Sequence, residues 1–153
     1  MSVWITPITD RTQSDVTNRT NKGFLNTSDL NRIEGNIAFL LNTLRSFQHF
    51  EQRQVRTNWI MTDIPAVEDF VRIEDNLRFL ERISRANIDV PDILAIITPN
   101  STRRITYGYI NRIEEVILHL HMAMTFMAQS YRFSGTFRSG EVTILPQLSL
   151  TNI

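Results

Sequence analysis

The fold of this chain is decided by a stretch that opens its first predicted helix, DLNRIEGNIAFL at residues 29–40. Similar stretches follow at residues 69–80 (DFVRIEDNLRFL) and 109–120 (YINRIEEVILHL). The Arg-Ile-Glu triplet starts at positions 32, 72 and 112, so the period is 40 residues without slippage. A constant period of this length is typical of a repeated supersecondary unit. The sequence therefore predicts a chain built from three copies of one helical unit.

Apolar residues recur three or four positions apart within each copy, which is the spacing of one face of an α-helix. The three stripes are Leu30, Ile33, Ile37, Leu40, Leu41 and Leu44; Phe70, Ile73, Leu77 and Leu80; and Ile110, Ile113, Ile117, Leu120 and Met124. We predict helices from Asn26 to about Gln48, from Asp63 to about Arg85, and from about Thr106 to about Gln129. Isolated helices of this length are marginal in water, so each must bury its stripe against the others. The predicted fold class is mainly α, a three-helix bundle made from three 40-residue repeats.

Short β elements are predicted outside the helical bundle, which occupies residues 25–130. Residues 1–24 form an N-terminal arm in which residues 3–7 favour β structure, and residues 131–153 form a C-terminal β-hairpin and tail. The connections between helices, of roughly twenty residues, are longer than bundle loops usually are. They either contain short strands, with residues 59–61 and 93–99 as candidates, or pack across the helix ends. A single helical turn is the alternative for residues 93–99.

The charge and composition exclude several classes of function. The formal net charge is zero, with 16 basic and 16 acidic residues. A nucleic-acid-binding surface needs an excess of basic residues to displace counterions, so no nucleic-acid partner is predicted. The chain has no cysteine, which excludes disulfides and thiolate metal sites. It has no apolar stretch long enough to span a bilayer and no signal-peptide pattern, so no membrane partner is expected.

Each Arg-Ile-Glu triplet places a glutamate at the edge of the apolar stripe, beside an isoleucine in the stripe. These structural positions are Ile33 and Glu34, Ile73 and Glu74, and Ile113 and Glu114. A buried carboxylate needs hydrogen-bonding partners. One hypothesis is that each glutamate accepts hydrogen bonds from a loop backbone or from an arginine of another copy. The alternative is that the glutamates are exposed and make only local contacts, as Glu74 would with Arg78.

The far side of the first predicted helix has a row that contains Arg32, Asn36 and Phe39. In the third copy the corresponding row includes Val116 and His119, and the helix is apolar nearly all round. A helix of this kind is normally buried on several sides. We therefore predict that the third helix is the central helix or carries a subunit interface.

No arrangement of residues predicts catalysis. His119 and His121 are two positions apart and point to different sides of a helix, whereas a helical metal pair needs a spacing of four. Glu114 and Glu115 also diverge, so they do not form an acid–base couple. The sequence has neither a phosphate-binding glycine loop nor a nucleophile elbow. We expect no enzymatic activity, no cofactor and no metal site.

The first quarter of the chain resembles a known kind of protein. It carries Trp4 and Pro7 in an arm, followed by the helix start LNTSDLNRIEGN at residues 25–36. This order is similar to a segment in tail and baseplate-region proteins of phages that infect Gram-positive bacteria, and of related phage-derived contractile bacteriocin particles. The second copy departs from the pattern at Val71 and the third at Val116, where the first copy has asparagine.

The resemblance implies a non-enzymatic structural component of a phage or phage-like contractile tail, in the baseplate or tail-fibre attachment region. Its partners would be other tail and baseplate proteins and a tail fibre. The chain would lie in a symmetric homo- or hetero-oligomer within the virion or particle, assembled in the bacterial cytoplasm. Extended termini and helix faces would hold these neighbours. The predicted contact residues are Trp4, Ile5, Arg32, Arg72, Val142 and Ile144.

The alternative interpretation is a soluble helical adaptor or regulatory protein. Such a protein would bind a partner helix or a ligand in an apolar groove along the third helix. The predicted lining of that groove is Val116, His119, Ala123 and Phe126.

Overall fold

The computed structural model describes residues 2–86, 88–93 and 105–134, and for residues 131–134 it describes the backbone alone. This part of the chain is mainly helical and contains no strand. Its elements are α1 (Gln13–Thr17), the 3-10 turn η1 (Asn21–Gly23), α2 (Thr27–Arg45), α3 (Val67–Ser84) and α5 (Tyr107–Ser134). The three long helices lie where the sequence predicts helices, and α5 continues past the predicted end at Gln129.

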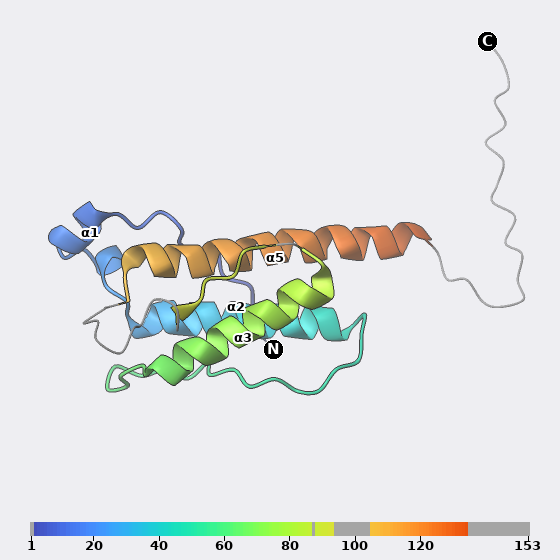
Figure 1. Cartoon of the computed structure of the whole chain (residues 1–153), viewed down its shortest axis with the longest axis horizontal. Coiled ribbons are helices and arrows are strands. Elements are labelled where there is room, and N and C mark those ends of the chain that lie inside the picture. The colour runs from blue at the N-terminus through green and yellow to red at the C-terminus, as the bar shows by residue number, and fades with distance from the viewer. Residues whose placement is uncertain (1, 87, 94–104, 135–153) are drawn as a thin grey trace, which may run out of the picture.

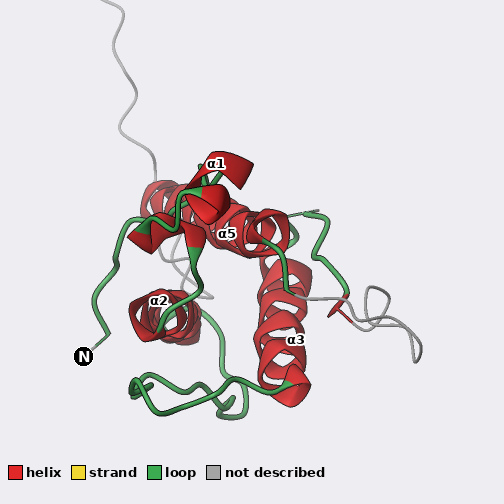
Figure 2. Ribbon diagram, turned by 90° about the vertical axis from the view of Figure 1, so that its left-hand side faces the viewer, coloured by secondary structure: helices red, strands yellow, loops and turns green. Residues whose placement is uncertain are grey.

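The helices α2, α3 and α5 pack around a shared core, and each of the three contacts the other two. The isoleucines of the three triplets, Ile33, Ile73 and Ile113, are each 1% exposed at the centre of that core. Figure 2 shows the three helices as separate rods arranged around this centre. The apolar stripes therefore form a single hydrophobic core, as the helical spacing predicts.

Aspartates fix the starts of α2 and α3. The side-chain oxygen of Asn26 accepts the N–H of Asp29 at 3.0 Å, and the Asp29 carboxylate accepts the N–H of Asn26 at 3.1 Å. This is a reciprocal capping box, which satisfies backbone donors that an α-helix leaves free at its start. In α3 the Asp69 carboxylate likewise accepts the N–H of Ala66 at 2.9 Å.

The start of α3 at Val67 is later than the predicted start at Asp63. The Asp63 carboxylate accepts the N–H of Ile60 at 2.9 Å and pairs with Arg56 at 2.6 Å. Asp63 therefore closes the turn before the helix, and Pro65 follows that turn outside the helix.

All three long helices run in the same direction. In Figure 1 each of them begins at the left-hand end and ends at the right-hand end of the molecule. A helix of 19 residues, such as α2, is about 28 Å long at 1.5 Å per residue. About ten extended residues, at roughly 3.1 Å each, are enough to return over that distance. The long connections therefore exist because the chain must come back to the same end before each new helix.

The prediction of short strands is wrong for the part of the chain that the structure describes. Residues 3–7 and 59–61 form no strand, because helix side chains, and not a neighbouring strand, satisfy the backbone groups of the extended segments. The C-terminal hairpin prediction is wrong at its start, since α5 runs through residues 131–134. The rest of that hairpin, and residues 94–99, lie outside the described residues.

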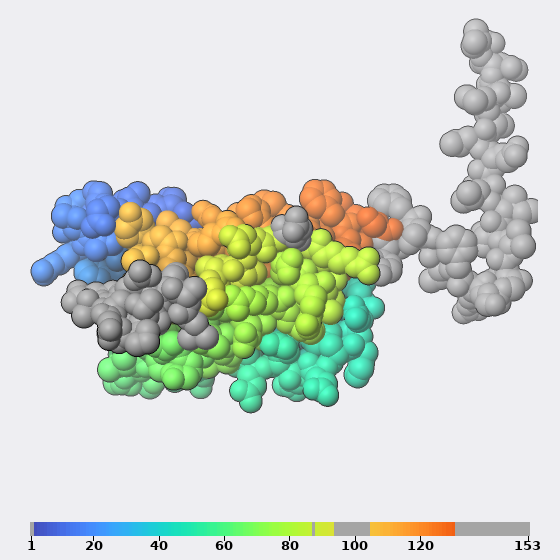
Figure 3. All heavy atoms as spheres, in the orientation of Figure 1, coloured from blue at the N-terminus to red at the C-terminus, as the bar shows by residue number. Residues whose placement is uncertain are grey.

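The N-terminal arm lies on the helices of its own chain. In Figure 3 its atoms cover one end of α5. The polar part of the arm contains α1, which begins with a capping box between Thr12 and Asp15. Gly23 packs so closely on the Asp15 carbonyl that an added Cβ would overlap it. The arm is therefore folded back tightly between residues 12 and 24.

Candidate functional site

The strongest polar feature of the molecule is the way its extended segments are fastened to the helices. We call residues 3–11, 53–59 and 88–93 the first, second and third segments. Each of them lies beside two of the long helices and precedes one of them in the chain. Their backbone groups bind side chains of the repeated helix motif, as the contacts of each segment show in turn.

The first segment is bound at every third residue. Asn36 of α2 accepts the N–H of Ile5 at 2.9 Å and donates to its carbonyl at 2.7 Å. Glu114 of α5 accepts the N–H of Ile8 at 2.7 Å. Asn111 of α5 accepts the N–H of Arg11 at 3.2 Å and donates to its carbonyl at 2.9 Å. Three-residue spacing matches the period of a polyproline-II helix, which has no internal hydrogen bonds of its own.

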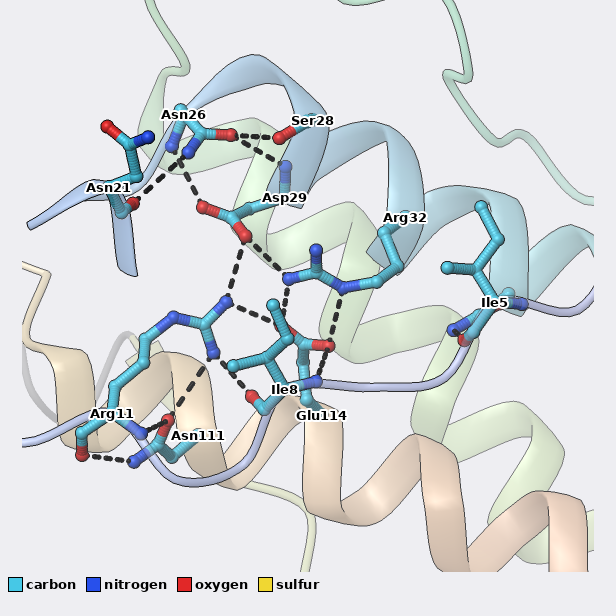
Figure 4. A network of polar contacts seen from close by, with 11 residues as sticks. Ile5, Ile8, Arg11, Asn21, Asn26, Ser28, Asp29, Arg32, Asn111 and Glu114 are labelled. Carbon is cyan, nitrogen blue, oxygen red and sulfur yellow. Dashed lines mark hydrogen bonds and ion pairs between the residues drawn. The ribbon is translucent and has the colours of Figure 1, made fainter. Parts of the chain in front are cut away.

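Glu114 is the centre of a buried charge network, which Figure 4 shows from close by. Its side chain is 0% exposed and accepts hydrogen bonds from Arg32 Nε at 2.9 Å, Arg32 Nη2 at 2.7 Å and Arg11 Nη2 at 2.8 Å. Both guanidinium groups also contact the Asp29 carboxylate. The network therefore contains two positive and two negative groups, as burial of charge requires.

The environment of Arg32 favours its charged form. Burial alone lowers the pKa of Arg32, but the hydrogen bonds and charges of Glu114 and Asp29 outweigh burial and raise that pKa above its usual range. The hydrogen bonding of Arg11 is less complete than that of Arg32. Among the described residues, Arg11 Nε is the one buried side-chain polar atom without a hydrogen-bond partner.

The second segment repeats the arrangement one helix further on. Glu34 of α2 is 0% exposed and accepts the N–H of Arg56 at 2.6 Å, and it also accepts Trp59 Nε1 at 3.2 Å and Arg72 Nη2 at 2.6 Å. Asn31 of α2 accepts the N–H of Trp59 at 2.8 Å and donates to its carbonyl at 3.0 Å. Glu34 and Asn31 thus have the roles that Glu114 and Asn111 have for the first segment.

Asn76 of α3 binds the beginning of the second segment, as Asn36 of α2 binds the beginning of the first. It accepts Arg53 Nε at 2.7 Å and donates to the Gln54 carbonyl at 2.8 Å. The bound residues of the second segment, Arg53, Arg56 and Trp59, again lie three positions apart. Asparagine and glutamate at equivalent positions of the 40-residue period therefore bind equivalent places in the first and second segments, although the sequences of the two segments are unrelated.

The third segment keeps the glutamate but has no clamping asparagine, and arginines bind two of its carbonyls instead. Glu74 of α3 is 2% exposed and accepts the N–H of Ile93 at 2.6 Å and the hydroxyl of Tyr109 at 2.7 Å. Tyr109 occupies the position at which the other copies have Asp29 and Asp69. Without an acid three residues before it, Arg112 turns outward to Glu115 at 3.3 Å and to the carbonyl of Asp89 at 2.9 Å.

Two pKa shifts reflect this difference. Burial raises the pKa of Glu74, although the hydrogen bonds from Tyr109 and from Ile93 oppose the effect. Burial, and then the hydrogen bond to Glu74, raises the pKa of the Tyr109 hydroxyl. The helices on either side of the third segment also have Val71, in α3, and Val116, in α5, where the clamping asparagines stand elsewhere. The site between α3 and α5 is thus a weaker version of the other two.

The hypothesis of buried glutamates is confirmed. All three accept a hydrogen bond from a segment backbone, and two, Glu34 and Glu114, also bind an arginine of another copy. The alternative of exposed glutamates is wrong. Arg32 and Asn36, predicted to lie on the far side of the helix from the apolar stripe, are buried as well. Asn36 is 1% exposed and Arg32 is 8% exposed, because the first segment covers them.

The predicted contact residues have different surroundings. Arg32 is enclosed in its own chain, and Arg72 pairs with Glu34 and Asp69 and keeps 24% of its side chain exposed. The role of Arg32 as a partner contact stays a prediction, which its pairing with Glu114 inside the chain does not favour. Trp4 is half-buried and stacks on His121, with ring centres 3.9 Å apart, whereas Ile5 is 52% exposed. Val142 and Ile144 lie outside the described residues.

The groove predicted along the third helix is not formed as expected. Val116 is 0% exposed in the core, whereas His119 and Phe126 are exposed on another side of α5. These side chains do not line one cavity. Helix α5 contacts α2, α3 and the first segment. Each long helix contacts the other two, so the central position or subunit interface of the third helix stays a prediction.

The described surface offers little that suggests chemistry. Within the described ranges no group of three or more histidine and acidic side chains could hold a metal ion. A hollow of about 660 Å³ lies between the second segment and α3. Arg53 and Phe79 line it, but the guanidinium lies over the ring at 4.6 Å and donates to Asn76.

Sequence reasoning missed the partners of the motif, namely Arg11, Trp59 and Tyr109. The recurrence of asparagine at 31 and 111, and at 36 and 76, was the available signal that the polar side of the motif has a structural role.

Comparisons with protein-family models, with curated proteins and with solved structures found no match. None of the described helices combines the length and apolar character that crossing a bilayer requires.

Proposed function

We propose that this chain is a non-enzymatic structural component of a phage or phage-like contractile tail, in the baseplate or tail-fibre attachment region. The resemblance of residues 3–36 to such proteins supports the proposal. The observation that carries it furthest is the use of the repeated polar motif. Glu34, Glu74 and Glu114 are buried and bound to backbone of their own chain, which supports a structural role for the motif.

We infer further that the chain is one unit used three times. The unit would be an extended segment followed by a helix, with the glutamate of each helix holding the segment that leads into the next. The first segment is bound by Glu114 of the last helix, so the series closes on itself. Equivalent contacts at two of the three positions and a reduced version at the third support this inference.

The mechanism that follows is assembly by a rigid block. Three parallel helices, with a segment fastened beside each pair, resist shear and bending, since sliding a segment would break several buried hydrogen bonds together. Neighbouring proteins would then contact the exposed parts of the termini and turns. This differs from a free N-terminal clasp, because residues 3–11 are already bound within the chain.

Deletion within the native particle tests the proposed function. A chain lacking residues 1–7 keeps the contacts of Ile8 and Arg11, so its bundle should still fold. We expect it, and a chain lacking residues 147–153, to be absent from purified particles, as judged by mass spectrometry of the particle fraction. The full-length tagged chain is the control.

Two outcomes would reject the tail assignment. One is the absence of the full-length chain from any particle in the host that encodes it. The other is normal incorporation of both deletion variants, because the termini would then have no part in assembly.

A further inference from the structure

The outer side of α5 exposes two large apolar side chains in the second half of the helix. Met122 is 47% exposed and Phe126 is 68% exposed. They are four positions apart and therefore lie on the same side of the helix. The first segment passes beside them, because Trp4 stacks on His121, the residue before Met122. The two side chains thus form an apolar surface next to an extended segment.

The first segment has a free backbone edge on this side. Both backbone groups of Ile5 are bound by Asn36 of α2. In an extended chain the residues before and after Ile5 direct their backbone groups to the opposite side, away from α2 and toward α5. These residues are Trp4 and Thr6, whose backbone groups make no hydrogen bond with any described residue. Such an edge is a template for another extended segment.

The chain itself has a segment that can reach this place. The described part of α5 ends at Ser134, past the ends of α2 and α3 in Figure 1, and residues 135–153 follow it. From Ser134 back to Phe126 is about 12 Å along the helix, at 1.5 Å per residue. Residues 135–141 span at most about 23 Å when extended. Val142 therefore reaches Phe126 with length to spare for a turn.

The direction of that return is also defined. The first segment runs against α5, since Trp4 lies at His121 and the N–H of Ile8 is bound by Glu114. A chain that turns back after α5 also runs against that helix. It therefore lies parallel to the first segment, and parallel extended segments form a regular hydrogen-bond ladder.

The sequence of residues 142–146, VTILP, suits such a ladder. Val142 and Ile144 are two positions apart, so they share one side of an extended chain. The stretch has the same valine, isoleucine and proline spacing as residues 3–7, VWITP. Side by side in the same direction, the two stretches bring their prolines, which have no N–H, to the same end of the pairing.

We propose that residues 142–145, which we call the C-terminal segment, dock on their own chain between the first segment and the outer side of α5. Because the segment runs against α5, Val142 covers Phe126. Ile144 then covers Met122, since two extended residues span about the same distance as one helical turn.

Two kinds of contact hold the C-terminal segment. The backbone groups of Trp4 and Thr6 bind its backbone, and the apolar side chains of α5 fix its register, as in other cases of strand addition. The connection through α5 favours this occupant over a separate molecule, because a short linker gives an effective concentration on the order of millimolar. These contacts lie within one chain and do not depend on the proposed function.

Amide hydrogen exchange of Thr6 in the full-length chain tests the docking. We expect Thr6 to exchange about tenfold faster or more in the double variant Val142→Glu/Ile144→Glu, because charged side chains do not lie on an apolar surface. The matched control is Thr143→Glu, which adds a charge on the opposite side of the same segment and should leave the exchange unchanged. The amide of Leu40, in the core, should exchange equally in all variants and shows that they are folded.

A substitution on α5 tests the other side of the contact. Met122→Ser removes part of the apolar surface and should also speed the exchange of Thr6. The matched control is Met61→Ser, which changes a methionine that is 93% exposed in the turn before α3 and should have no effect.

Three results would overturn the proposal. The first is exchange of Thr6 in the wild type at the rate of an unstructured residue. The second is equal exchange of Thr6 in the wild type and in Val142→Glu/Ile144→Glu. The third is protection of Thr6 that is lost on dilution, because the occupant would then be a second copy. None of these results bears on the incorporation of the chain into particles, which tests the proposed function separately.

Discussion

At the scale of single residues, the molecule depends on carboxylates placed where water cannot reach them. Glu114 receives one backbone N–H and two guanidinium groups, and Glu34 receives one backbone N–H, one indole N–H and one guanidinium. A buried ion pair of this kind adds little stability over a well-packed apolar substitute, but removing one partner is costly. The chain therefore gains a defined position for each segment at the risk of severe destabilisation by a single substitution.

Replacing the central carboxylate should be severe. Glu114→Gln removes a negative charge from a network that keeps Arg11 and Arg32 buried, so we expect a loss of about 3–5 kcal/mol in the free energy of unfolding, measured by urea denaturation. The matched control is Glu115→Gln, since Glu115 pairs only at the surface with Arg112. It should change the stability by less than about 0.5 kcal/mol. Equal effects of both variants would contradict the central role of Glu114.

Arg85 is a residue at which stability can be gained. It ends α3 in the left-handed region, with φ at 54°, a conformation that costs a non-glycine residue about 1 kcal/mol. Arg85→Gly should therefore raise the free energy of unfolding by about 1 kcal/mol. Arg82→Gly, inside the same helix, should lower it by a similar amount. A destabilised Arg85→Gly variant in a thermal melt would show that the side chain contributes more than the strain.

Glu74 and Asp69 should give pH dependences of opposite direction. The folded pKa of Glu74 is raised, so its contribution is fully present below its ordinary pKa near 4.5 and is lost as the pH rises through the folded value. Glu74→Gln should therefore cost more at pH 4 than at pH 7. Burial raises the pKa of Asp69, but hydrogen bonds from Ala66 and Arg72 outweigh burial and lower that pKa below 3.8. Its contribution is present above 3.8 and lost as the pH falls through the folded value.

Asp69→Asn should accordingly cost most at pH 7 and lose its effect only below about pH 3.8. Urea denaturation of both variants and of the wild type at pH 7, 4 and 3 measures the two profiles. Parallel profiles for the two variants would contradict the assignment, because the two folded pKa values would then be shifted in the same direction.

At the scale of elements, the parallel helices and the extended segments explain each other. Parallel neighbours require a return path of helix length, and an extended return path leaves backbone groups unpaired unless another part of the chain binds them. Asn36, Asn76 and the three glutamates meet that need. An antiparallel bundle would have had short loops and no use for this motif.

Asn36→Val tests the fastening of one segment. It reproduces the residue found at position 116, removes both hydrogen bonds to Ile5 and leaves those of Ile8 and Arg11 in place. We expect faster chymotrypsin cleavage after Trp4 and a loss of about 1–2 kcal/mol in stability. Asn42→Val, at an exposed position of the same helix, is the control and should leave cleavage unchanged. An unchanged cleavage rate in Asn36→Val would show that Trp4 is held by its stacking on His121 alone.

Helix positions could be predicted from the sequence because the apolar stripes of Ile33, Ile73 and Ile113 have a strict helical period. The burial of the glutamates was one of two alternatives, since a residue at the edge of a stripe can be either buried or exposed. Their partners could not be predicted, because Ile8, Arg56 and Ile93 lie in segments with no common pattern and are recognised through backbone N–H groups that every such residue has. When a residue is recognised through its backbone N–H group, its side chain need not be of any particular type, so the sequence does not reveal the contact.

At the scale of the whole molecule, the described part of the chain forms one core. Each long helix binds one extended segment, and the last helix binds the first segment. The last helix holds the first segment through Glu114, which joins residues more than a hundred positions apart. Stability should therefore be shared between the two ends of the described chain and lost in one transition. The weakest point of the series is the contact between the third segment and α3, where valines replace the clamping asparagines and tyrosine replaces an aspartate.

The most direct test of this account is amide hydrogen exchange of Ile8, Arg56 and Ile93 in the folded protein. These residues lie outside the long helices, so a surface loop would exchange them within the dead time of the experiment. The account predicts that all three are protected almost as strongly as the core amides of α2, because each N–H is bound to a buried glutamate. Exchange of all three at the rate of unstructured residues would contradict it.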